Sequence, residues 1–222
     1  MSVLHVGMSF DFTCPWSLIG KHNLDLAVQR LARLRPEVSV QVEWLGLQLL
    51  PEIPLAGMAC ADFYDRRLGG AEAARARQVE IQAAAASAGL TLALERIRVM
   101  PNTATAHRVF AQAARLGNDA QQERLLDRLF AAHFLMGEDI GQRETLGEAL
   151  ESAGYDAAAF ADVLQEGVRY YIGRRVGLAD ISVPLFLVND RPALVGARSA
   201  EQLLDALCRS VDAAPVRQER RG

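Results

Sequence analysis

The chain has 222 residues, of which 50% are apolar and 23% charged, and its formal net charge is −3. This length and composition suit one large domain, or a domain carrying a sizeable insertion, and exclude intrinsic disorder. The slight acidic excess disfavours nucleic acid as a partner, and no apolar run reaches the roughly 18 residues of a membrane span. We therefore expect neither nucleic acid nor a membrane as a partner.

The amino-terminal residues and the cysteines indicate the cellular compartment of the protein. The first residues carry no visible export signal, so we expect a cytoplasmic location. The three cysteines, Cys14, Cys60 and Cys208, are odd in number and widely scattered, which predicts neither a disulfide framework nor a metal site. In a reducing compartment, thiol chemistry would be catalytic or sensing.

The first 45 residues predict a βαβ unit. Apolar side chains alternate over residues 4–10 and again over 38–44, which indicates two strands. A helix is predicted between them from Pro15, because proline suits the first helical position. The two strands should be parallel, with a right-handed crossover.

The middle of the chain, from about residue 62 to 176, is predicted to be helical. Ala, Leu, Arg, Glu and Gln dominate there, and glycines and a Pro-Asn pair break the sequence into segments. We expect helices at residues 60–68, 71–88, 103–116, 119–136, 144–153 and 157–176.

A hairpin and a last helix are predicted to close the chain. Residues 181–188 and 193–195 are typical of strands, with turn residues between them, and a capping box at Ser199 starts the helix. The predicted organisation is an α/β domain of residues 1–58 and 177–211, an inserted helical domain of residues 59–176, and a tail. The tail, residues 212–222, is charged and unpatterned, so we expect it to be frayed.

Cys14-Pro15-Trp16-Ser17 is the tetrad with the clearest chemical meaning. Cys14 should stand at a helix start, where unpaired N–H groups and the helix dipole favour an anion. A thiol there is expected to titrate well below ~8.5, within roughly 3.5–7.5, and the thiolate is the nucleophile of disulfide exchange. The alternative interpretation is a small apolar residue that fills a strand-to-helix turn.

Pro184 interrupts residues that are otherwise typical of a strand, where proline removes a ladder donor. One interpretation is a cis Val183–Pro184 bond in a turn before the strand, which leaves the preceding backbone free to pair with a ligand. The other is an ordinary trans proline at a strand start. A Cys-Pro helix start after the first strand and a proline opening a late hairpin together form the layout of the thioredoxin fold.

The sequence resembles the DsbA family of thioredoxin-fold proteins, in its cytoplasmic FrnE-like branch. The resemblance rests on segments that occur in order at residues 11–21, 101–108, 137–140 and 183–188. It implies an α/β, thioredoxin-like fold with an inserted all-helical domain. It also implies a thiol–disulfide oxidoreductase in which Cys14 attacks, Pro15 and Trp16 shape the helix start and cover the sulfur, and Val183 and Pro184 bind the substrate.

Ser17 departs from this family, whose fourth position is usually the resolving cysteine. Serine has no exchangeable sulfur, so we expect a monothiol site that acts through mixed disulfides and is released by an external thiol such as glutathione. Ser17 would donate a hydrogen bond to the Cys14 thiolate. A natural monothiol enzyme and an engineered Cys-to-Ser exchange are both open, and Cys60 is a weaker candidate for the resolving thiol.

Kappa-class glutathione transferases and 2-hydroxychromene-2-carboxylate isomerases share the insertion layout. They carry serine where this chain has Cys14, and a late aspartate where this chain has Gly196-Ala197-Arg198. A glutathione-dependent isomerase or transferase is the second hypothesis, and a non-catalytic thioredoxin-fold binding protein is the third. No cofactor is required, glutathione is a candidate co-substrate, and the expected partners are thiols or disulfides of proteins or small molecules. We expect a monomer or a homodimer.

Four further polar residues are candidates for structural roles or for tuning the thiol. His107 and His133 stand among apolar residues of predicted helices, so we expect hydrogen-bonded structural histidines. Asp11 and Glu43 flank the first two strands and are candidates for tuning the thiol electrostatically.

Overall fold

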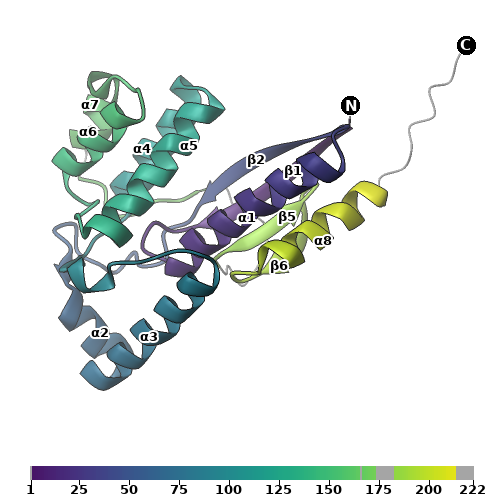
Figure 1. Cartoon of the computed structure of the whole chain (residues 1–222). Coiled ribbons are helices and arrows are strands. Elements are labelled where there is room, and N and C mark those ends of the chain that lie inside the picture. The colour runs from purple at the N-terminus through teal and green to yellow at the C-terminus, as the bar shows by residue number, and fades with distance from the viewer. Residues whose placement is uncertain (1, 166, 174–182, 214–222) are drawn as a thin grey trace, which may run out of the picture.

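A four-stranded mixed sheet forms the centre of the computed structural model, which describes residues 2–165, 167–173 and 183–213 (Figure 1). The strands lie in the order β2-β1-β5-β6. β1 is parallel to β2 and antiparallel to β5, and β5 pairs antiparallel with β6. The strands are β1 (Ser2–Phe10), β2 (Val38–Gly46), β5 (Leu185–Val188) and β6 (Arg191–Val195). This is the expected α/β, thioredoxin-like arrangement.

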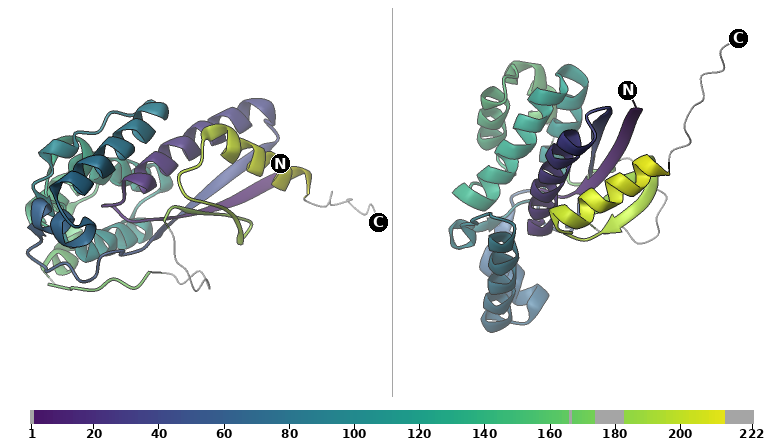
Figure 2. Two further views of the ribbon diagram at one scale, coloured as in Figure 1. Left: turned by 90° about the horizontal axis from the view of Figure 1, so that it is seen from below. Right: turned by 45° about the vertical axis from the view of Figure 1, so that its right-hand side comes forward.

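Two helices lie side by side on one face of the sheet, α1 (Pro15–Leu34) and α8 (Ala200–Asp212) (Figures 1 and 2). The alternating apolar side chains of β1 and β2 form a buried core with the apolar stripe of α1, as the period of each segment predicts. Pro15 is the first residue of α1, so the predicted βαβ unit is confirmed.

The chain between β2 and β5 forms, over its described residues, helices, two short strands and connecting loops (Figure 1). Its helices are α2 (Cys60–Leu68), α3 (Ala71–Ser87), α4 (Ala104–Leu116), α5 (Asp119–Ala131), α6 (Arg143–Ser152) and α7 (Ala161–Gln165). The strands β3 (Met58–Ala59) and β4 (Val99–Met100) pair antiparallel. Helices α4–α7 gather beside the sheet, and α2 and α3 form a separate pair. No helix in the described ranges is long and apolar enough to cross a membrane.

The helix predicted over residues 157–176 is wrong over residues 167–173, and its residues 166 and 174–176 lie outside the described part of the chain. A 3₁₀ turn (Ala157–Phe160) leads into α7, and residues 167–173 form no helix. The side chain of Gln48 accepts the Tyr171 N–H at 2.7 Å, and that of Asn102 donates to the Arg169 carbonyl at 3.2 Å. These two buried amides satisfy backbone groups that a helix would otherwise pair, so tertiary contacts override local helix propensity.

The carboxyl-terminal elements agree with the sequence pattern. Asn189 and Asp190 form the turn between β5 and β6, with φ of 50° and 61°. Ser199 and Gln202 make the predicted capping box of α8. The strand residues predicted at 181–182 and the tail beyond residue 213 lie outside the described residues. The domain limits stay a prediction.

The end of β1 rests on aromatic side chains from the helical segment. Phe10 and Phe12 make edge-to-face contacts with Phe110 of α4, with ring centroids 5.5 Å and 5.9 Å apart. Phe130 of α5 packs on Phe12 at 5.6 Å. The turn that carries Cys14 therefore stands where the sheet meets the helical segment.

Candidate active site

Cys14 is the N-cap residue of α1. Its backbone N–H donates to the Asp11 carbonyl at 3.1 Å, and its carbonyl accepts the Ser17 N–H at 3.0 Å. These bonds close the strand-to-helix turn that the sequence predicts. The residue is 7% exposed, so its thiol lies just beneath the surface.

The Val183–Pro184 peptide bond is cis and lies opposite Cys14. The Cys14 sulfur is 3.9 Å from the carbonyl oxygen of Val183, in reach of a weak S–H···O hydrogen bond. The Pro184 carbonyl accepts the Gly196 N–H at 2.8 Å, which ties this turn to the end of β6. The predicted cis bond and its place beside the thiol are confirmed, although the two segments are far apart in the sequence.

The expected low pKa of Cys14 is wrong in direction. Burial raises the pKa of the thiol, and the charge of Asp11 adds to this. Hydrogen bonds from the Ser17 hydroxyl and from the backbone of Ser17 and Trp16 lower the pKa, as a helix start should, but burial is the largest contribution. The resting site therefore holds a protonated thiol that donates to Val183.

Ser17 is fully buried one helical turn beyond Cys14. Its oxygen accepts the Asp11 N–H at 3.3 Å, which leaves its own hydroxyl hydrogen free to point at the Cys14 sulfur. The predicted hydrogen bond between Ser17 and the thiol agrees with the lowering effect of Ser17 on the Cys14 pKa. Ser17 thus links the thiol to the end of β1.

The Asp11 carboxylate connects the Cys14 turn to two other segments. One oxygen accepts the Thr13 N–H and hydroxyl, both at 3.0 Å, and the other accepts the Leu49 N–H at 2.6 Å. The second oxygen also accepts the Thr103 hydroxyl at 3.3 Å. Asp11 is completely buried, and the sequence-based expectation that it tunes the thiol agrees with its effect on the Cys14 pKa.

His107 faces Asp11 from the first turns of α4. Its Nε2 lies 3.9 Å from an Asp11 carboxylate oxygen, and its ring stacks on Tyr171 at 5.0 Å between centroids. Within the described part of the chain neither ring nitrogen makes a hydrogen bond, so the expected hydrogen-bonded structural histidine is wrong. The His107 imidazole instead lies between the rings of Phe12 and Tyr171 and beside the Asp11 carboxylate.

A cavity of ≈540 Å³ opens beside Cys14. One wall is the Cys14 turn with Trp16 and Val183, and the other comes from α2 and α3. Phe63, Tyr64, Arg67 and Arg77 line that second wall, and sequence reasoning did not select any of them. Their helices carry no motif, and only the packing of α2 and α3 brings them to the thiol.

The other two cysteines lie elsewhere. Cys60 packs with Leu50, Ile53 and Met100 in a small separate core and is absent from the described lining of the Cys14 cavity. Burial raises the pKa of its thiol. Cys208 is half-buried against the main core, as its position on α8 predicts. Neither contact set supports a role for these thiols beside Cys14.

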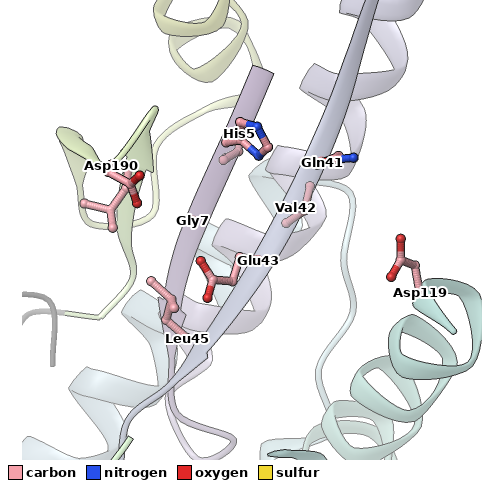
Figure 3. Close-up of a pocket in the computed structure, with 10 residues that line it drawn as sticks. His5, Gly7, Gln41, Val42, Glu43, Leu45, Asp119 and Asp190 are labelled. Atoms are coloured by element: carbon pink, nitrogen blue, oxygen red, sulfur yellow. The ribbon is translucent and has the colours of Figure 1, made fainter. Parts of the chain in front are cut away.

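A second hollow, of ≈680 Å³, lies on the sheet away from the thiol (Figure 3). His5 of β1 and Glu43 of β2 point into it, with Asp119 at the start of α5 and Asp190 of the β5–β6 turn at its edges. It contains no thiol. Among the residues that the structure describes, no three His, Cys, Asp or Glu side chains gather as metal ligands. The chemistry therefore points to the Cys14 cavity.

Comparisons with known proteins show the fold and the family of the chain. The chain is similar to a solved structure named as a probable DsbA oxidoreductase from Streptomyces coelicolor, with 25% identity and a TM-score of 0.81, covering 95% of this chain and 91% of that one. A 2-hydroxychromene-2-carboxylate isomerase structure shares the fold, with 18% identity and a TM-score of 0.57, over 92% of this chain and 95% of that one. A comparison with curated proteins found no significant match. A family model, the DSBA-like thioredoxin domain, matches residues 5–208, and the chain therefore belongs to the DsbA family of thioredoxin-fold proteins.

Proposed function

We propose that this protein is a monothiol thiol–disulfide oxidoreductase of the FrnE type. Cys14 is the nucleophile, Val183 presents its backbone to the substrate, and Pro184 holds that backbone open beside the thiol. Pro15 and Trp16 shape the helix start over the sulfur, and Ser17 occupies the place of a resolving thiol. Glutathione is the proposed co-substrate, and a reducing cytoplasm would supply it.

The proposed reaction is an exchange with no net change in oxidation state. Cys14 loses its proton, and the thiolate attacks one sulfur of a substrate disulfide. A new S–S bond forms to Cys14, the substrate S–S bond breaks, and the other sulfur leaves as a thiolate that takes up a proton. An external thiolate, such as that of glutathione, then attacks the mixed disulfide. The Cys14 thiolate leaves and is reprotonated.

One observation carries this proposal. A cysteine that caps a helix lies 3.9 Å from the carbonyl of a residue before a cis proline, and a cavity opens beside the two. A thiol with an accessible space on one side and the Val183 backbone on the other is the arrangement that disulfide exchange needs. The buried Ser17, one turn further along, limits the site to a single sulfur.

The raised pKa of Cys14 sets the expected rate. Because burial keeps the thiol protonated, exchange should be slow near neutral pH and should accelerate as the pH rises through the thiol titration. Substrate binding would add donors near the sulfur and favour the thiolate. A steep rise of rate with pH is therefore a property of this proposal.

Mass spectrometry of the intact protein after treatment with oxidised glutathione, over a series of pH values, tests the proposal. We expect one glutathionyl adduct, on Cys14, in the wild-type chain and in the double variant Cys60→Ser, Cys208→Ser. The adduct should be absent in Cys14→Ser. Reduced glutathione should remove it and should be required for insulin reduction.

Other outcomes would favour the other hypotheses. No adduct on Cys14 at any pH where the protein stays folded would favour a non-catalytic binding protein. Glutathione-dependent isomerisation of a chromene carboxylate without disulfide exchange would favour the isomerase. Against the isomerase stand the cysteine at position 14 and the absence of an aspartate at Gly196-Ala197-Arg198.

A further inference from the structure

The wall of the Cys14 cavity that faces the thiol is both aromatic and basic. Phe63 and Tyr64 of α2 meet edge-to-face, with ring centroids 5.3 Å apart, and Trp16 lies on the opposite side. Rings of this kind provide a large apolar surface for a substrate side chain. The wall therefore has room for an apolar group next to the reacting sulfur.

Two arginines complete this wall, and both lie over aromatic rings. The Arg77 guanidinium is 5.2 Å from the centroid of Trp16, and that of Arg67 is 5.9 Å from the centroid of Phe63. The described residues that line the cavity include no Asp or Glu. The described lining of the cavity therefore contains two guanidinium groups and no carboxylate.

Both arginines have carboxylate neighbours that a ligand can replace. Arg77 pairs with Glu80 at 2.6 Å, and Arg67 lies 3.8 Å from Glu52. Both glutamate side chains are more than half exposed, at 57% and 60%. Exposed ion pairs of this kind contribute little to stability, and each guanidinium has five N–H donors. A carboxylate in the cavity can therefore bind these arginines without breaking a strong pair.

Given the exchange reaction proposed above, on which this inference rests, we infer that Arg67 and Arg77 select the substrate. The selected substrates are peptide disulfides that carry an acidic side chain and an aromatic or aliphatic side chain beside the reacting cysteine. The apolar group packs on Phe63 and Tyr64, and the carboxylate binds the two guanidinium groups. This charge selection would set which disulfides reach Cys14.

The test uses three disulfide-linked peptides that differ at one position. Each carries Cys-Phe followed by Glu, Gln or Lys, and the rate of mixed-disulfide formation with Cys14 is followed by mass spectrometry. The Glu peptide should react about fivefold faster than the Gln peptide, and the Lys peptide should be the slowest. Raising the ionic strength to about 1 M should remove most of the difference.

Matched variants identify the groups responsible. Arg67→Gln and Arg77→Gln should each reduce the preference for the Glu peptide by about twofold, and the double variant should abolish it. Arg75→Gln, on an exposed part of α3 outside the cavity lining, should leave the preference unchanged. A preference that survives in the double variant, or equal rates of the three peptides with the wild-type chain, would overturn the inference.

A binding measurement separates this inference from the exchange reaction. Fluorescence anisotropy reports binding of each labelled peptide to Cys14→Ser, which cannot exchange. Tighter binding of the Glu peptide that depends on both arginines supports the inference. It does so even if the wild-type chain forms no mixed disulfide, because the absence of a mixed disulfide overturns only the proposed function. Binding that is independent of charge overturns the inference. The inference is also overturned if binding of oxidised glutathione depends on the two arginines and binding of the peptides does not, because the arginines would then recognise the carboxylates of glutathione.

Discussion

The imidazole of His107 lies 3.9 Å from the carboxylate of Asp11, and both side chains are fully buried. The pair joins α4 to the end of β1, directly beneath the turn that carries Cys14. Burial raises the pKa of Asp11, but the polar contact and charge of His107 and the N–H groups of Thr13 and Leu49 outweigh it, so the net pKa is lowered. Asp11 therefore keeps a negative charge close to the thiol.

Asp11→Asn should make Cys14 more reactive and the fold less stable. Removing the charge that raises the Cys14 pKa should increase the rate of iodoacetamide alkylation at pH 7 severalfold. The amide cannot accept every hydrogen bond that the carboxylate accepts, so the free energy of unfolding should fall by about 1–3 kcal/mol. Alkylation kinetics with peptide mapping and urea denaturation measure the two effects.

Glu148→Gln, on an exposed part of α6, is the matched control for this charge removal. It should leave both quantities unchanged. An alkylation rate in Asp11→Asn equal to that of the wild-type chain would mean that the Asp11 charge does not act on the thiol.

The buried His133 should make the protein less stable in mild acid. Burial lowers its pKa to about 4, whereas the unfolded side chain titrates near 6.5. Between these values the unfolded chain binds a proton that the folded protein does not. The His133 contribution therefore lowers the free energy of unfolding by roughly 3 kcal/mol as the pH drops from 6.5 to 4, and it stays constant below pH 4. Urea denaturation across this range measures the slope.

His133→Gln removes the titrating group and should flatten the slope between pH 4 and 6.5, whatever its effect on stability at neutral pH. Gln82→Asn, on an exposed part of α3, changes no titrating group, serves as the control and should keep the slope. Any further loss below pH 3.8 belongs to carboxylates such as Asp11, whose lowered pKa stabilises the fold only while the group is ionised. An unchanged slope in His133→Gln would contradict the assignment.

Ser17→Cys should convert the monothiol site into a dithiol site. A sulfur one helical turn beyond Cys14 can attack the mixed disulfide intramolecularly, at an effective concentration far above that of free glutathione. Insulin reduction with dithiothreitol as the only added thiol should therefore accelerate in the variant, and the oxidised variant should contain an internal disulfide by mass.

Ser17→Ala is the companion variant, because it removes the hydroxyl without adding a sulfur. Losing the hydrogen bond that lowers the Cys14 pKa should slow alkylation of Cys14. If Ser17→Cys gains nothing and the parent turns over without an external thiol, another group resolves Cys14.

Two glycine-to-alanine substitutions should change the free energy of unfolding in opposite directions. A Cβ at Gly20 of α1 would lie 2.9 Å from the Pro184 ring, in a packed contact, so Gly20→Ala should destabilise the fold by about 1–3 kcal/mol. It should also slow exchange, because it pushes Pro184 away from the helix that carries Cys14. A Cβ at Gly147 of α6 would meet no described atom within 4 Å beyond its own helix backbone, so Gly147→Ala should stabilise by about 0.5–1 kcal/mol.

Thermal and urea denaturation of both variants decide this prediction. A loss of stability in Gly147→Ala would contradict the open space around its Cβ, and a gain in both variants would mean that helix propensity alone controls the two positions. The contact between Gly20 and Pro184 would then have no energetic role.

Local patterns in the sequence were sufficient for the framework of the site. Alternating apolar residues predicted β1 and β2, Pro15 predicted the start of α1, and the out-of-place Pro184 indicated a cis bond, whereas the resemblance to the thioredoxin fold placed that bond opposite Cys14. The strands, the helix start and the cis bond are local features. Each of these depends on residues within one turn or one strand of each other. The order of the elements then placed the thiol at the end of the sheet.

Tertiary structure alone decided the chemistry around that framework. The pKa direction of Cys14 depends on burial by segments distant in the chain, and the Asp11–His107 pair joins residues of separate elements. The cavity wall that carries Arg67 and Arg77 exists only because α2 and α3 pack across from the Cys14 turn. Propensity and periodicity act over a few residues, whereas desolvation and long-range hydrogen bonding depend on which distant segments meet.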